Sequence, residues 1–181
     1  MAIKAPATAH PRTAGRASAR RRLAARAGLL ALCALGFTTD ADAASNKVRI
    51  SSLSDVTFGT LSDLSSDAAQ SQSLCLYSDT ATNGYNVTAT GGGPGGSFQL
   101  TSGLSSLAYE VQWSNASGRN SGVQLSPNVP LTGQTSAASH QVCSNGPATS
   151  ASLIVLLRSA SLSSVTAGTY SGTLTLLVGA E

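Results

Sequence analysis

Apolar and polar residues alternate in short segments from Val48 to the end of the 181-residue chain. The clearest alternation covers residues 108–113, where three large apolar side chains fall on one face, as in a half-buried β-strand. No segment combines good helix formers with an apolar period of 3.6 residues. Further strands are expected at these apolar positions: Ile50, Val56, Phe58, residues 74–77, 85–89 and 98–100, Val123, Leu125, Val129, Leu131 and residues 174–178.

The C-terminal third contains the longest apolar run. Residues 153–157 are Leu-Ile-Val-Leu-Leu, apolar on both faces, which predicts a central strand. Glycine, proline, asparagine and serine separate the expected strands, and the glycine-rich residues 91–96 are expected to form a turn or loop. Pro127 and Pro130 suit a sheet edge, where a missing N–H is harmless. Short strands at this spacing predict an all-β protein built as an antiparallel β-sandwich.

The N-terminal residues differ in composition from the rest of the chain. They are basic and contain no acidic residue before Asp40, and an apolar run covers residues 27–37. Small residues ending at Ala43 follow, so the segment has the three parts of a secretory signal peptide. The apolar run is too short to cross a bilayer, and no transmembrane anchor is expected. We predict a signal peptide at residues 1–43 and a mature domain at residues 44–181.

Two other interpretations of this leader are weaker. Arg20-Arg21-Arg22-Leu23 loosely resembles a twin-arginine signal, but an ordinary basic n-region accounts for the arginines. Cys33 could accept a lipid, but Leu32 is the wrong size before such a site.

Removing the leader changes the charge and the cysteine count. The whole chain has a net charge of +3, whereas residues 44–181 contain four basic and six acidic residues and carry −2. Nucleic-acid binding needs clustered Lys and Arg, so no nucleic-acid partner is expected. Cys75 and Cys143 remain as a pair, and in an exported chain they are predicted to form one disulfide.

Candidate catalytic and binding residues are few. His140 is the only mature histidine and has no nucleophile elbow nearby. Asp63 and Asp67 lie in a serine-rich segment that suits a solvated turn better than a glycosidase pair. We expect that the protein is not an enzyme and that it has no catalytic residue, no metal site and no cofactor. Trp113 is expected in the core rather than on a sugar-binding surface, and Tyr170 is expected to bond a loop backbone through its hydroxyl.

Four segments resemble a known family when they are taken in order. They are Asp-Val-Thr-Phe-Gly-Thr-Leu at residues 55–61, Leu-Cys-Leu-Tyr at 74–77 with Gly-Tyr-Asn-Val at 84–87, Leu-Ala-Tyr-Glu-Val at 107–111, and Ala-Gly-Thr-Tyr-Ser-Gly-Thr-Leu at 167–174. Together they resemble secreted fimbrial subunits of the spore coat protein U type, which include pilins of archaic chaperone–usher pili. Gly172 stands where that family usually has Asp, and a neighbouring fimbrial-like family shares the Tyr-Ser-Gly-Thr ending.

The resemblance implies an immunoglobulin-like sandwich that lacks its final strand. Such a subunit has an open groove that another polypeptide fills with a strand. The resemblance also implies a role in a surface fimbria or in adhesion. The implied partners are a periplasmic chaperone, an outer-membrane usher and other pilus subunits, and the implied route is export to the periplasm and then to the cell surface. The alternative is a free secreted β-sandwich that recognises a glycan or a protein.

The N-terminal segment of the mature chain has two open interpretations. Val48, Ile50 and Leu53 could be the side chains of a donor strand, although the alternation breaks between Ile50 and Leu53. The same segment could instead be the first strand of its own domain. A subunit of the second kind would accept a strand and give none, as expected at a fibre tip.

Overall fold

The computed structural model describes residues 2–4 and 46–181, which belong to one compact unit. The predicted signal peptide and its cleavage site therefore lie outside the described residues, except for Ala2–Lys4. Strands are the main secondary structure of the described chain and hold a little under half of its residues. In this part of the protein, no helix combines the length and the apolar character needed to cross a membrane.

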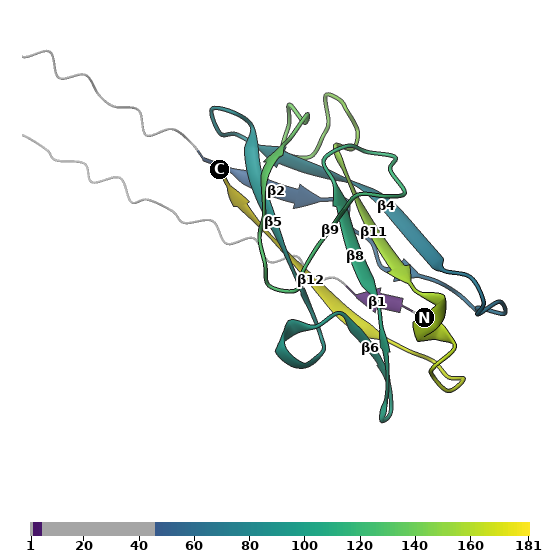
Figure 1. Ribbon diagram of the computed structural model, residues 1–181. Coiled ribbons are helices and arrows are strands. Elements are labelled where there is room, and N and C mark those ends of the chain that lie inside the picture. The colour runs from purple at the N-terminus through teal and green to yellow at the C-terminus, as the bar shows by residue number, and fades with distance from the viewer. Residues whose placement is uncertain (1, 5–45) are drawn as a thin grey trace, which may run out of the picture. The chain divides into compact units, whose positions relative to one another are not determined.

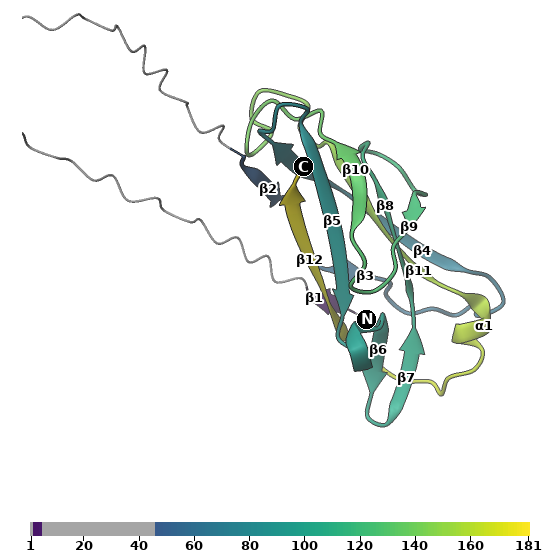
Figure 2. The same cartoon turned by 60° about the vertical axis from the view of Figure 1, so that its left-hand side comes forward.

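The first sheet has five strands in the order β10–β5–β12–β1–β3 (Figures 1 and 2). Its strands are β10 (Leu131–Thr135), β5 (Gly84–Gly91), β12 (Gly172–Ala180), β1 (Ala2–Lys4) and β3 (Val56–Thr57). The pairing of β1 with β12 is parallel, and the other pairings are antiparallel. This order places β12 beside β5 on one side and beside β1 on the other.

The second sheet is antiparallel throughout and has the order β2–β4–β11–β8–β9. Its strands are β2 (Val48–Ser51), β4 (Ala68–Ser78), β11 (Ala151–Leu157), β8 (Glu110–Ser114) and β9 (Val123–Gln124). β11 is the middle strand, which confirms the central position predicted from its apolar run. The chain between β9 and β10 contains Pro127 and Pro130 and joins the edges of the two sheets.

Smaller elements lie between the sheets' strands in the sequence. β6 (Gln99–Ser102) and β7 (Ser105–Ala108) form a hairpin, and α1 (Ser159–Leu162) follows β11. The glycine-rich residues 91–96 end β5 and form the short 3-10 turn Pro94–Gly96, as expected of a loop. The hairpin tip and α1 lie near the same end of the domain (Figure 2).

The first strand of the sandwich changes sheets partway along its length. β2 pairs with β4 as far as Ser51 opposite Cys75, and Ser52 then adopts a left-handed φ of 64°. The Gln72 side chain holds the backbone at this crossing with two hydrogen bonds. Its Oε1 accepts from the Ser54 N–H (3.0 Å), and its Nε2 donates to the Ser54 carbonyl (3.0 Å). The chain then continues as β3 at the far edge of the first sheet.

The apolar core draws its side chains from both sheets, as an immunoglobulin-like sandwich requires. Tyr109, Val111 and Trp113 are buried in it, which confirms their predicted core position. The rest of the buried cluster includes Leu74, Leu76, Tyr85, Val87, Ala89, Leu100, Leu153, Val155, Leu157, Leu174 and Leu176. The alternation of apolar residues along each strand therefore marks the faces that meet between the sheets.

A loop covers the other face of the second sheet. The Ser152 hydroxyl on β11 donates to the Ala116 carbonyl (2.9 Å) and accepts from the Arg119 N–H (3.0 Å). The Gly118 N–H donates to the Ser73 hydroxyl on β4 (2.8 Å). Ile154 alternates with the core residues of β11, yet it is 0% exposed. β11 is thus buried on both faces.

The predicted disulfide between Cys75 and Cys143 is confirmed, with an S–S distance of 2.07 Å. It attaches the segment that follows β10 to β4, and both sulfurs lie in a small cluster with Ala138, away from the main core. The Ser150 hydroxyl in the same segment donates to the Leu76 carbonyl (2.7 Å). The bridge therefore fastens a long irregular segment to the second sheet.

Candidate functional site

The last strand, β12, has one edge that is only partly paired. On one side it pairs with β5 from Leu174 opposite Gly91 to Ala180 opposite Tyr85. On the other side it pairs with β1 only at Gly172 and Thr173. Among residues 2–4 and 46–181, residues 174–180 have no strand partner on that second side. Unpaired N–H and C=O groups along an edge are a template for another strand.

β1 occupies the space between β12 and β3. It runs parallel to β12, with Ile3 opposite Gly172, and antiparallel to β3, with Ile3 also opposite Val56. Figure 2, which labels all three strands, shows β1 beside β12. We call the space between β3 and β12 the strand lane. The lane has room for one strand that pairs with both neighbours at once.

Apolar side chains border the strand lane on its core side. Val56 and Phe58 are buried on the β3 side, and Leu174 and Leu176 are buried on the β12 side. Val178 is partly buried against the same core, whereas the alternating residue Leu177 is exposed. β12 therefore directs Leu174, Leu176 and Val178 to the core and Leu177 to solvent. A strand in the lane would pair with the open edge of β12, beside these core side chains.

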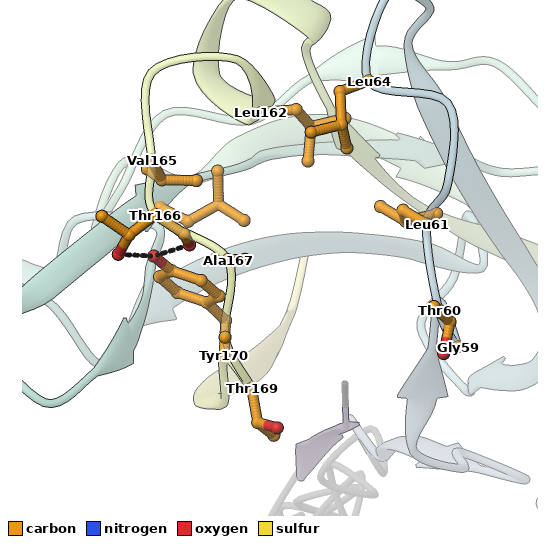
Figure 3. Close-up of a pocket in the computed structure, with 12 residues that line it drawn as sticks. Gly59, Thr60, Leu61, Leu64, Leu162, Val165, Thr166, Ala167, Thr169 and Tyr170 are labelled. Carbon is orange, nitrogen blue, oxygen red and sulfur yellow. Dashed lines mark hydrogen bonds between the residues drawn. The ribbon is translucent and has the colours of Figure 1, made fainter.

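A pocket of about 470 Å³ lies at the end of the strand lane where β12 begins. Leu61 and Leu64 come from the segment after β3, and Leu162 and Val165 come from α1 and the segment after it (Figure 3). β1 pairs Ala2 with Thr57, so a strand continued beyond that point would approach Gly59 and the pocket. The pocket therefore extends the lane and has two apolar walls.

Tyr170 fixes one wall of the pocket. Its hydroxyl donates a hydrogen bond to the Thr166 carbonyl (2.8 Å), which Figure 3 shows across the loop. The Tyr170 ring is buried. This arrangement confirms the prediction that Tyr170 bonds a loop backbone through its hydroxyl. The loop that leads into β12 is thereby held in a defined shape.

The proposed donor residues lie in or beside the first strand of this domain. Val48 and Ile50 belong to β2, opposite Ser78 and Leu76 of β4, and Leu53 follows at the crossing between the sheets. All three donor candidates are partly buried against the domain's own core. In the structure the segment therefore pairs as a strand of this domain, and its role as a donor strand stays a prediction.

The candidate catalytic residues are not gathered into a site. His140 is exposed, and its Nε2 lies 2.9 Å from the amide nitrogen of Asn145. Hydrogen bonds from the Ser65 and Ser66 hydroxyls and the Ser65 N–H hold the pKa of Asp63 below its ordinary value. Within residues 46–181, no group of three His, Cys, Asp or Glu side chains is placed to hold a metal ion. The expectation of a non-enzymatic protein stays a prediction.

Most of the pocket could not be recognised from the amino-acid sequence. Leu64, Leu162 and Val165 stand in serine-rich segments without strand periodicity. The signal that was present is a pair of apolar residues three positions apart on each side, at Leu61 and Leu64 and at Leu162 and Val165. Such a pair predicts a short turn with one apolar face, but it does not predict which segment lies opposite.

The chain has a distant likeness to proteins of known structure. No family model matches the chain, and no curated protein matches it. Among solved structures, the chain is similar to one from a chaperone–tip adhesin complex of CFA/I fimbriae biogenesis, with 15% sequence identity and a TM-score of 0.48. The likeness covers 75% of this chain and 41% of that one, so this chain spans less than half of its length. At this identity and TM-score, the likeness carries no argument about function.

Proposed function

We propose that residues 44–181 are a structural or adhesive subunit of a surface fimbria, completed by a strand from another polypeptide. Two of the four segments that resemble spore coat protein U-type subunits border the strand lane. Residues 55–61 contain β3 and part of one pocket wall, and residues 167–174 contain Tyr170 and the start of β12. The resemblance and the open edge thus concern the same part of the domain.

One observation carries the proposal. The strand that occupies the lane, β1, belongs to residues 1–43, which the sequence predicts to be removed on export. Without β1, the lane side of β12 would lose its pairing at Gly172 and Thr173 as well. The mature domain would then need a strand from elsewhere at the place where the precursor has its own.

The energetic gain from an added strand supports this role. Each net backbone hydrogen bond contributes about 0.5–1.5 kcal/mol, and residues 174–180 offer their open side to several such bonds. A strand would also shield Val178, which is only partly buried, from water. An exposed edge of this kind binds other chains readily, so a dedicated periplasmic chaperone would protect it before assembly.

The position of the first strand favours a subunit that accepts a strand without giving one. With cleavage after Ala43, only residues 44–47 would precede β2, and a donor strand needs about five residues to present alternating side chains. Releasing Val48 and Ile50 for that purpose would break their pairing with β4. This arrangement fits the tip of a fibre.

The proposed route of the chain is export to the periplasm and then to the cell surface. The basic leader directs the chain to the periplasm, where a disulfide such as Cys75–Cys143 forms and persists. The chaperone would hold the subunit there, and an outer-membrane usher would pass it to the cell surface beside other pilus subunits. The proposed role is non-catalytic.

The test uses the chain exported from a bacterial host. Its intact mass reports whether cleavage follows Ala43. Thermal unfolding is then measured with and without a synthetic peptide of Met1–Ala9, which contains the segment that pairs in the lane. We expect the peptide to raise the unfolding temperature and to slow hydrogen exchange in β12. The control peptide carries Ile3→Pro, because proline lacks the N–H that a central strand uses.

A stable monomer that gains nothing from the peptide would be the contrary result. A mature monomer that unfolds reversibly at one temperature, with or without the peptide and with every β12 amide already protected, would refute the proposal. That result would favour the alternative, a free secreted module that binds a glycan or a protein.

A further inference from the structure

An ion-pair network stands where the two walls of the pocket begin. The ladder between β4 and β11 ends with Leu157 opposite Ala68, and the next residues on the two strands are Arg158 and Asp67. Arg158 Nη1 lies 2.8 Å from Asp67 Oδ2. The backbone N–H of Ser159 donates to Asp67 Oδ1, also at 2.8 Å. One carboxylate thus binds both the side chain and the backbone of the facing strand end.

The same guanidinium reaches a third strand. Arg158 Nη2 lies 2.6 Å from Glu110 Oε2 on β8, so Arg158 bridges two carboxylates from different parts of the second sheet. The hydrogen bond to Glu110, followed by the one to Asp67, raises the pKa of Arg158. The Ser159 N–H and the Arg158 side chain lower the pKa of Asp67. Both shifts favour the charged forms that make the network.

The chain diverges from this network into the two walls. Before Asp67, residues 59–66 form the wall that carries Leu61 and Leu64. After Arg158, the chain continues through α1 to the wall that carries Leu162 and Val165. Residues 59–66 contain no strand or helix, so their position depends on their two ends. Asp67 anchors the end that faces the other wall.

The exposure of the network indicates what it does. The side chains of Arg158, Asp67 and Glu110 are 43%, 41% and 34% exposed, and ion pairs this open to water add little to global stability. They can still fix the positions of the groups that they join, because the planar guanidinium presents its donors in a rigid fork.

We propose that Arg158 is a positioning residue for the strand lane. By holding Asp67 and Glu110 together, it sets the spacing between the two pocket walls that an incoming strand must enter. This inference rests on the proposed strand-accepting function. Its immediate consequence is local, because loss of the network should loosen the walls and leave the rest of the sandwich intact.

The test compares hydrogen exchange in the full chain with that of two matched variants. Asp67 and Asp79 directly precede and follow β4, so Asp67→Asn and Asp79→Asn remove the same charge at opposite ends of one strand. We expect Asp67→Asn to speed exchange in residues 59–66 and 160–170 by roughly fivefold, the factor that one surface ion pair can supply. Asp79→Asn should leave both walls unchanged, and amides of β4 and β11 should be unaffected in either variant.

A second variant and two contrary results complete the test. Arg158→Lys keeps the charge but loses the two-carboxylate geometry, so it should loosen the same walls even if Asp67→Asn fails to fold. Unchanged exchange in the walls would overturn the inference, and so would equal acceleration in β4 and β11, which indicates a purely structural role. In the unmodified full chain, β1 is present and should protect the amides that it pairs with in β12. Fast exchange at both Gly172 and Thr173 would therefore count against the strand-accepting groove, and the comparison of the two walls would stay valid.

Discussion

Two buried tyrosines differ in one respect, the partner of the hydroxyl group. Tyr85 is 0% exposed, and its hydroxyl accepts a hydrogen bond from the Trp113 indole N–H (3.0 Å). Tyr109 is 4% exposed and stacks on Phe98, but its hydroxyl has no hydrogen-bond partner among the described residues. The same substitution to phenylalanine should therefore have different effects at the two positions.

Tyr85→Phe removes the acceptor and leaves the buried Trp113 N–H without a partner. A buried donor left in this way costs about 1–3 kcal/mol. Tyr109→Phe removes a hydroxyl that was desolvated without compensation, so the free energy of unfolding should stay the same or rise by about 1 kcal/mol. The two variants should thus differ by about 1–4 kcal/mol, although each loses one oxygen atom.

Urea denaturation of the exported protein measures this difference. Trp113 is the single tryptophan of the chain, and its fluorescence reports unfolding of the core. Circular dichroism is the necessary second probe, because Tyr85→Phe also changes the surroundings of the indole. Equal slopes of free energy against urea would show that both variants unfold as the parent does. If Tyr109→Phe destabilises the protein as much as Tyr85→Phe, the hydrogen-bond reasoning is refuted.

Two further predictions concern alkaline pH and reduction. Burial raises the pKa of Tyr85 and of Tyr109 to about 12, whereas an unfolded tyrosine titrates near 10. As the pH rises, the unfolded chain therefore loses these protons before the folded chain does. The free energy of unfolding present below pH 10 should then fall between pH 10 and 12 by up to about 2.7 kcal/mol per tyrosine. Thermal unfolding against pH checks this, and a flat profile would contradict it. Reducing Cys75–Cys143, which are 68 positions apart, should cost about 4 kcal/mol in a urea titration with and without dithiothreitol, whereas a loss below about 1 kcal/mol would contradict the loop-entropy account.

The sequence was most informative where burial and periodicity agree. The alternation at Tyr109, Val111 and Trp113 predicted a half-buried strand, and the two-faced apolar run of β11 predicted the central strand. The polar half of β4, Ala-Ala-Gln-Ser-Gln-Ser, gave no such signal. It is a strand because β11 pairs with it as far as Ala68 opposite Leu157, and a neighbouring strand can impose extended structure on residues of low strand propensity.

The candidate site was predictable only in part for a similar reason. Alternation along β12 predicted which residues face the core, but it did not determine whether Val48 and Ile50 pair within the domain or outside it. The ion pair of Asp67 with Arg158 joins residues that are 91 positions apart. Because neither residue has a local pattern that refers to the other, only the register of β4 on β11 brings them together.

The loop that covers Ser152 and Ile154 has a consequence for the whole domain. At β11 the protein is three layers thick, with the first sheet on one side and the loop of residues 115–121 on the other. All but one residue of the middle layer, β11, are buried. A strand that enters or leaves beside β12 therefore does so opposite a strand that is packed on both faces.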